Sequence, residues 1–118
     1  MNGRRKGLDG EREAVALLRA EGLRVVRVAS DRDSRDDIDV DAVILPPGES
    51  PAVLVQIKRE ERAPIAWFGF LGRHRAVMCR RNGEAWSVWI AALPADLGDP
   101  PLELTPERFA RWCLGGMV

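Results

Sequence analysis

A short stretch of alternating acidic and apolar residues constrains the fold of this chain more than any other feature. Residues 37–44 read Asp-Ile-Asp-Val-Asp-Ala-Val-Ile. Because successive side chains of a strand point to opposite faces of a sheet, the alternation predicts a strand with one apolar face and one acidic face. The Pro/Gly-rich turn at 46–51 and the apolar run at 52–58 predict that a second strand returns beside it.

The register of this hairpin decides which side chains meet. If the hairpin is symmetric about its turn, Asp39 lies opposite Lys58 and Asp41 lies opposite Gln56, with all four on one face of the sheet. The sequence therefore predicts acidic and polar groups side by side at the end of the hairpin that is far from the turn.

Helix and turn signals place the other elements around this hairpin. Thr105 before Pro106 is typical of a helix start, and Asn82-Gly83 is typical of a tight hairpin turn. The expected elements are a helix at 9–21 between an Asp9 cap and Gly22, strands at 23–28, 75–81 and 84–91, a short helix or irregular segment at 62–72, a loop after Pro94 and a terminal helix at 106–114.

These elements predict one α/β domain over residues 1–118, with a central mixed β-sheet flanked by helices. A chain of 118 residues has room for one core only. We expect residues 1–7 to form a basic N-terminal arm and residues 95–118 to form a loop and the C-terminal helix.

Composition narrows the classes of function. The formal net charge is zero, with 18 basic and 18 acidic residues, so a generally basic nucleic-acid binder is excluded. The sequence has neither an apolar run long enough to span a membrane nor a signal-peptide pattern, so we expect a cytoplasmic protein without a membrane partner. Cys79 and Cys113 lack zinc-site spacing and are expected to be reduced, buried thiols.

The charges are nonetheless unevenly distributed. Six aspartates crowd residues 31–41, and stretches rich in arginine flank them in the sequence. This distribution is typical of a metal held between carboxylates and rimmed by phosphate-binding arginines. The alternative is a solvated acidic loop with ordinary surface arginines.

The first predicted helix carries an acid on its apolar side. Glu11 falls on the same helical stripe as Val15 and Leu18, which faces the core. An inward carboxylate needs a metal or a hydrogen bond, because burial of an unpaired charge is costly. The alternative is an acid that interacts with the helix dipole.

Two acids on different elements, followed by a strand lysine, predict phosphodiester hydrolysis. The reaction requires neutralisation of charge on the phosphate and an activated water, and carboxylate oxygens suit Mg²⁺. Glu11 and Asp39 would supply metal ligands together with the backbone carbonyl of Ile57. Lys58 would place its ammonium beside the attacking water or the phosphate. The chain contains only two lysines, Lys6 and Lys58, which favours a specific need for an ammonium on that strand.

The first half of the chain contains several further motifs in a defined order. They are Arg5-Lys6-Gly7, Glu11-Arg12-Glu13, Gly22, Val25-Val26-Arg27, a loop with serines, Ile38-Asp39 followed by Ala42, and Val55-Gln56-Ile57-Lys58. In order and spacing this series resembles the archaeal-type Holliday junction resolvases. The resemblance implies the PD-(D/E)XK restriction-endonuclease-like fold.

The resemblance also implies roles for residues and partners. It implies that Glu11, Asp39 and Lys58 are catalytic and that Gln56 occupies the second acidic position of the family, where it would act as a metal ligand. It implies a Mg²⁺-dependent homodimer, with Mn²⁺ as a substitute, that cuts four-way DNA junctions and has no small-molecule substrate. The DNA contacts expected from it and from the charge pattern are Arg4, Arg5, Lys6, a loop serine at Ser30 or Ser34, Arg59 and Arg62.

The chain departs from the family pattern at two places. Gln56 brings no charge to the metal, so another acid, Asp41 or Asp37, would have to compensate. The long helix expected after Lys58 is shortened into the aromatic segment 67–70, which forms either a dimer contact or part of the core. Two alternative functions therefore remain, a general or sequence-specific repair nuclease and a catalytically silent DNA-binding module.

Overall fold

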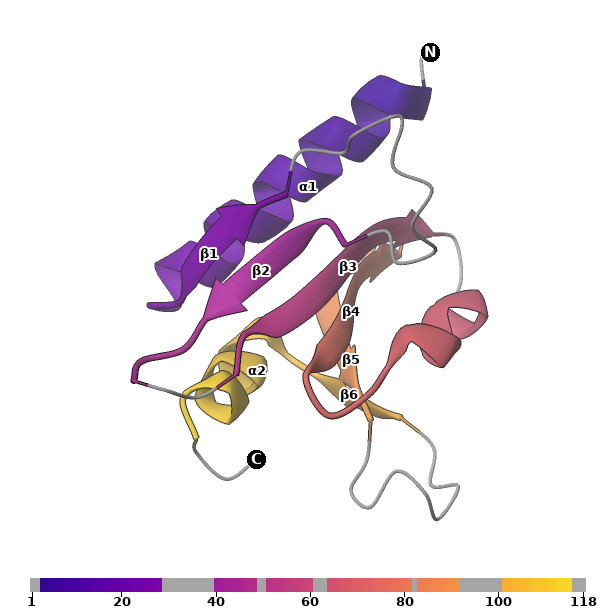
Figure 1. Cartoon of the computed structure of the whole chain (residues 1–118). Coiled ribbons are helices and arrows are strands. Elements are labelled where there is room, and N and C mark those ends of the chain that lie inside the picture. The colour runs from indigo at the N-terminus through magenta and orange to yellow at the C-terminus, as the bar shows by residue number, and fades with distance from the viewer. Residues whose placement is uncertain are drawn as a thin grey trace.

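Six strands of one mixed sheet follow each other in space in the order of the chain, within the part that the structure describes (Figure 1). The computed structural model describes residues 3–28, 40–48, 51–60, 64–81, 83–91 and 101–115. The elements are α1 (Gly3–Ala20), β1 (Arg24–Arg27), β2 (Ala42–Leu45), β3 (Val53–Glu60), the 3₁₀ helix η1 (Ile65–Phe70), β4 (Arg75–Arg81), β5 (Trp86–Ile90), β6 (Leu102–Leu104) and α2 (Pro106–Cys113). Neighbouring strands are antiparallel except β3 and β4, which are parallel. The predicted α/β class with a mixed sheet and flanking helices is confirmed.

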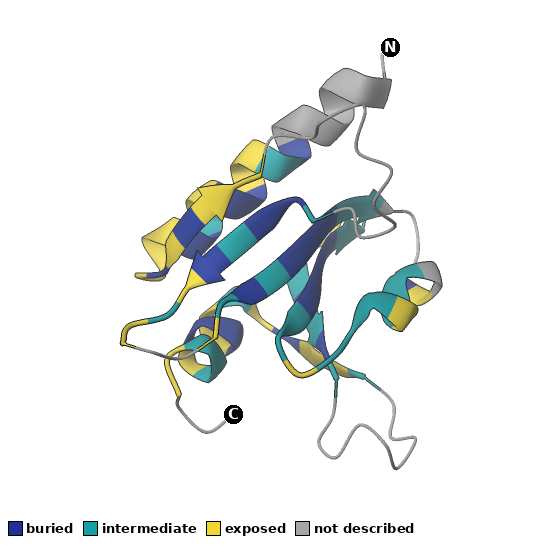
Figure 2. Cartoon of the chain, in the orientation of Figure 1, coloured by how far each residue is buried: buried dark blue, intermediate teal, exposed yellow. Residues whose placement is uncertain are grey.

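The two faces of β3 meet different elements. The side chain of Arg59 packs against Gly10 of α1, so the odd-numbered residues of β3 face the helix. The ammonium of Lys58 lies over the ring of Trp67 in η1, so the even-numbered residues face the crossover segment. The core lies on the helical face, where α1 and α2 also contact each other, and Figure 2 shows buried and partly buried residues alternating along β2. The polar residues at even positions of β3 are thus separated from the main core.

α1 begins earlier than the sequence predicts. The helix starts at Gly3, so the predicted start at Asp9, with Asp9 as its cap, is wrong. The first turns of α1 therefore include the basic residues that were expected to form an arm, because arginine and lysine are good helix formers. The predicted end is confirmed, since the helix stops at Ala20 and Gly22 adopts a positive φ of 91°.

β2 begins later than the sequence predicts. Its first residue is Ala42, whereas the alternating pattern predicted a strand from Asp37. Asp37 and Asp39 lie outside the described residues. Asp41 is described and lies just before the strand, because its carboxylate bonds to β3 in place of a continuing backbone ladder.

The C-terminal half of the sheet largely follows the prediction. β4 and β5 form the antiparallel hairpin expected around Asn82-Gly83, and Gly83 has a positive φ of 77°. Thr105 caps α2 by accepting a hydrogen bond from the backbone N–H of Arg108. β6 was missed, because three residues are too few to show an alternation.

The aromatic crossover segment joins the protein interior on one side. η1 is the short helix that the sequence left open between residues 62 and 72. Phe68 packs against Trp89 of β5 with 5.1 Å between ring centroids. Phe70 lies beside the guanidinium of Arg75. These contacts support the core alternative for η1, although Ile65 remains 70% exposed.

Neither cysteine forms a disulfide within the described part of the chain, as expected for reduced thiols. Cys79 is buried in β4 and Cys113 is partly buried at the end of α2. Burial raises the pKa of the Cys113 thiol to about 12. Cys113 therefore stays a thiol at neutral pH and is expected to react slowly with alkylating reagents.

The close approach of α1 and β3 at Gly10 gives a testable prediction. A Cβ at position 10 would lie 2.8 Å from Cδ of Arg59. Gly10→Ala should gain about 0.5–1 kcal/mol of helix propensity. It should lose about 1–3 kcal/mol from overpacking, so that the free energy of unfolding falls.

Urea denaturation measures this balance. Ala16 is an exposed residue of the same helix, and Ala16→Gly provides the propensity difference alone. The double variant Gly10→Ala/Arg59→Ala should lack the clash and be less destabilised than the sum of its single variants. Additive single effects would show that Gly10 and Arg59 do not interact in this way.

Candidate functional site

Asp41 lies where β2 and β3 stop pairing. The ladder ends with Ala42 opposite Val55. Beyond it, the N–H of Asp41 donates to the carbonyl of Val55 at 3.0 Å, and Oδ2 of Asp41 accepts from the N–H of Ile57 at 2.7 Å. The carbonyl of Asp41 accepts from Val28 at the end of β1. The buried carboxylate of Asp41 is therefore fixed in the fork between the two strands.

Gln56 lies between the two residues of β3 that bond to Asp41, because Asp41 contacts the carbonyl of Val55 and the N–H of Ile57. The ladder itself, with Ala42 opposite Val55, has the register that the hairpin symmetry predicted. Gln56 is 1% exposed, and its Oε1 has no hydrogen-bond partner among the described residues. A buried polar atom without a partner is costly, so this oxygen is expected to have a function.

Lys58 lies two residues further along the same face of β3. Its side chain is partly buried, and Nζ lies 3.9 Å from the centroid of the Trp67 ring. Within the described part of the chain Lys58 forms no ion pair. The positive charge of Lys58 is therefore not neutralised by a carboxylate of those residues.

Glu11 reaches the same end of the sheet from α1. Its Oε2 lies 3.4 Å from Nη2 of Arg27, and its side chain is 25% exposed. Val15 and Leu18 of the same helical stripe are buried, which confirms the predicted inward side of α1. Because Arg27 pairs with Ala42, Glu11 is tied to the strand end next to Asp41.

Several predicted site residues lie outside the description. Asp39, Ser30, Ser34 and Arg62 belong to undescribed segments, and the side chains of Arg4, Arg5 and Lys6 are not described either. Arg59 is described, and its aliphatic part packs on Gly10 while its Nε is buried without a partner. The structure thus brings together Asp41, Gln56, Ile57 and Lys58, with Glu11 tied to the neighbouring strand.

The model of the archaeal Holliday junction resolvase (Hjc) family matches residues 2–66, more than half of the chain. The chain belongs to this family. The matched part contains α1, β1, β2 and β3, and with them Glu11, Asp41, Gln56 and Lys58. No curated protein and no solved structure matches the chain. Membership of the resolvase family points to a Holliday junction resolvase or a related nuclease, and thus to branched DNA as a partner.

Members of the family are generally metal-dependent, and the donor atoms of this chain suit a hard divalent cation. The carboxylate of Asp41 and the amide oxygen of Gln56 are oxygen donors, and the carbonyl of Ile57 adds a third. Among the described residues, no group of three or more His, Cys, Asp or Glu side chains could hold a metal. Amide and backbone oxygens are ligands of another kind, and Gln56 Oε1 is a buried atom that a cation would satisfy.

Sequence reasoning placed Asp41 in a secondary role, as an acid that compensates for Gln56. In the structure Asp41 lies directly beyond the end of the β2–β3 ladder, and its carboxylate bonds to β3. The signal was present in the register, since the hairpin symmetry alone sets Asp41 against Gln56. The alternating pattern did not reveal which aspartate would bond to the backbone of β3.

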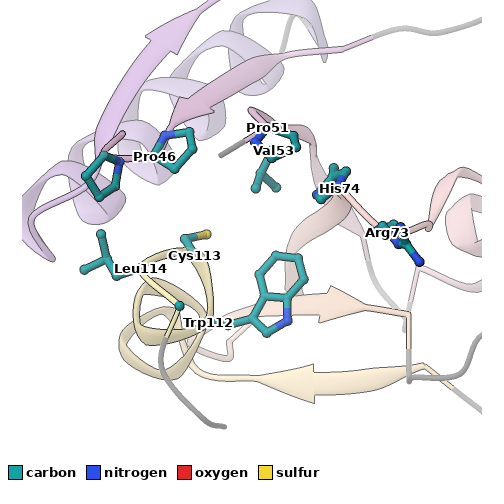
Figure 3. Close-up of a pocket in the computed structure, with 10 residues that line it drawn as sticks. Pro46, Pro51, Val53, Arg73, His74, Trp112, Cys113 and Leu114 are labelled. Atoms are coloured by element: carbon teal, nitrogen blue, oxygen red, sulfur yellow. The ribbon is translucent and has the colours of Figure 1, made fainter. Parts of the chain in front are cut away.

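A separate pocket of about 300 Å³ opens at the beginning of β3 (Figure 3). Its lining residues include Pro46, Val53, His74, Trp112 and Cys113. Glu11, Asp41, Gln56 and Lys58 do not line this pocket, and it lies nearer the β2–β3 turn than the fork does.

In the described residues no helix has the length and apolar character of a membrane span.

The hydrogen bond between Asp41 and Ile57 predicts different effects for two substitutions. Asp41→Ala leaves the buried N–H of Ile57 without this acceptor and should lower the free energy of unfolding by about 1–3 kcal/mol. Asp41→Asn keeps an oxygen acceptor of similar size and should be less destabilising.

Urea denaturation of both variants without added metal measures this difference. Equal losses for Asp41→Ala and Asp41→Asn would show that the hydrogen bond does not stabilise the fork.

Proposed function

We propose that this chain is a divalent-metal-dependent endonuclease that resolves four-way DNA junctions by phosphodiester hydrolysis. The observation that carries the proposal is the buried amide oxygen of Gln56, which has no partner among the described residues, one residue before the N–H that donates to the carboxylate of Asp41 and two residues before Lys58. These residues lie in the part of the chain that matches the resolvase family. Family membership supports nuclease action on branched DNA, and the arrangement of oxygens supports a metal-dependent mechanism.

In the proposed mechanism, one group of residues holds the metal and Lys58 acts on the phosphate or the water. Asp41, Gln56 and the carbonyl of Ile57 would hold Mg²⁺, with Asp39 and Glu11 as further oxygen donors. The bound ion would supply positive charge against the negative charge that develops on the phosphate. Lys58, on the same strand face as Gln56, would contact a phosphate oxygen or orient the attacking water.

Backbone contacts and symmetry would direct the enzyme to junctions. The arginines at the start of α1, together with Arg59 and Arg62, are candidates for contacts with phosphates. A homodimer would present two copies of the site to the two opposed strands of a junction. Paired incisions on opposed strands follow from such an arrangement.

Cleavage assays test the proposal directly. The protein is incubated with Mg²⁺ or Mn²⁺ and labelled four-way junctions, beside a linear duplex of the same sequence. The expected result is paired nicks near the branch point and little cutting of the duplex. Equal cutting of both substrates would support a general nuclease, and tight junction binding without cleavage would support a silent binding module, which the neutral Gln56 makes the main alternative.

Individual substitutions should separate binding from cleavage. Lys58→Ala and Asp41→Asn should each lower cleavage by about a hundredfold or more, because they remove charges at the reacting phosphate. Asp39→Asn tests whether that aspartate, predicted to lie opposite Lys58, has the same importance.

Junction affinity and cleavage rate are measured for each of these variants. Glu107→Gln, an exposed ion-pair residue on α2, is the matched control and should cleave normally. If Lys58→Ala keeps most of the cleavage rate, the site assignment is wrong.

Metal-dependent stability gives a further test that does not require activity. A ligand that binds only the folded state raises stability, by about 2.7 kcal/mol at a hundredfold excess over Kd. Mg²⁺ or Mn²⁺ should therefore raise the Tm of the wild type, and Gln56→Glu should raise it more at low metal. Gln56→Met fills similar volume without an oxygen, so its Tm should respond less than that of the wild type. An equal response of all three proteins would place the metal elsewhere.

A further inference from the structure

The contact between Lys58 and Trp67 combines a residue of the site with a residue outside the family match. The matched region ends at residue 66, one residue before Trp67. The Nζ of Lys58 lies 3.9 Å from the ring centroid, which is well within the range of a cation–π interaction. The ammonium of Lys58 therefore contacts the indole of Trp67 and forms no ion pair in the described part of the chain.

The backbone that carries Trp67 is held by contacts that do not involve Lys58. The backbone N–H of Trp67 donates to the carbonyl of Pro64 at 2.9 Å, and Pro64 is fully buried. The next residue, Phe68, packs against Trp89 of β5. The 3₁₀ helix is therefore anchored before and after Trp67 in the chain, and it presents the indole to Lys58 from a fixed backbone.

A fixed platform matters because lysine is a flexible side chain. Four rotatable bonds let an unrestrained ammonium occupy many positions, most of them away from the reacting phosphate. A pre-formed ring over which the charge rests removes this freedom in advance, as proximity catalysis requires. The ring is also uncharged, so the ammonium remains able to attract a phosphate, whereas a carboxylate partner would neutralise it.

We propose that Trp67 is a positioning residue for Lys58, and that η1 supplies this platform where the family resemblance leads us to expect a long helix. The inference rests on the proposed function. It extends the site beyond the family match, from β3 to the crossover between the two parallel strands. Trp67 itself does not contact the reacting atoms and acts through Lys58.

Nuclear magnetic resonance of the lysine side chains tests the geometry without any need for activity. Protons that lie over an aromatic ring are shifted upfield by its ring current. The chain has two lysines, so loss of one signal set in Lys58→Arg assigns Lys58. The terminal methylene protons of Lys58 should be upfield of those of Lys6 in the wild type and should move to ordinary positions in Trp67→Leu. Unshifted Lys58 signals in the folded wild type would overturn the inference.

Cleavage kinetics on a four-way junction test the role in catalysis. Trp67→Leu should lower kcat by about tenfold or more, because the charge is no longer placed at the phosphate. KM should stay within about twofold, since the charge itself is retained for binding. Trp67→Phe keeps an aromatic face and should stay within about threefold of the wild-type kcat.

A control variant separates positioning from general loss of stability. Trp112 stacks on Phe109 in α2, and Trp112→Leu should lower stability without lowering kcat at temperatures where it is folded. A Trp67→Leu protein that is folded and keeps the wild-type kcat overturns the inference while the proposed function stands. If the wild type cleaves no junction, both the proposed function and the role of Trp67 are overturned. The wild type is therefore assayed before any Trp67 variant.

Discussion

The hydrogen bond from the backbone of Ile57 to the carboxylate of Asp41 is the interaction on which the site depends. Two antiparallel strands that continue to pair leave no room for other atoms between them, so a site between strands requires the ladder to end. Ending it costs the backbone of β3 an acceptor, and a buried N–H without a partner is unfavourable. Asp41 supplies that acceptor from its side chain. The same residue thus ends the ladder and places a carboxylate in the opening.

Odd- and even-numbered side chains of β3 lie on opposite faces of the sheet, and this alternation decides what each of them contacts. Val55 and Ile57 enter the core under the helices, and Arg59 on the same face is held against Gly10. Gln56 and Lys58 point to the other face, which the short crossover η1 covers only in part. Because the side chains of a strand alternate, one segment of β3 both anchors the core and carries a polar pair on its other face. Stability and chemistry are therefore divided between the two faces of one strand.

The sequence predicted the parts of this arrangement that local rules control. The alternation at 37–44 and the proline-rich turn were enough to predict the register in which Ala42 pairs with Val55, and the signals at Asn82-Gly83 and Thr105 gave the correct hairpin and helix. The start of α1 and the existence of β6 were not predictable in the same way. Helix formers continue upstream of Asp9, and a three-residue edge strand depends on pairing with β5. The bond from Ile57 to Asp41 depends on where the ladder ends, and no local pattern specifies that point.

The neutral side chain at position 56 has consequences for both the empty and the loaded site. A carboxylate there would lie beside the buried Asp41, and two like charges at such a position repel each other unless a cation lies between them. Gln56 avoids this repulsion, so the fold does not need a metal to tolerate a side chain at this position. In the proposed site the neutral side chain would also provide one negative charge fewer to Mg²⁺ and so weaken its attraction. Asp41, Asp39 and Glu11 would then have to supply the charge that binds the metal, and the carboxylate fixed by Ile57 would be the most important of the described donors.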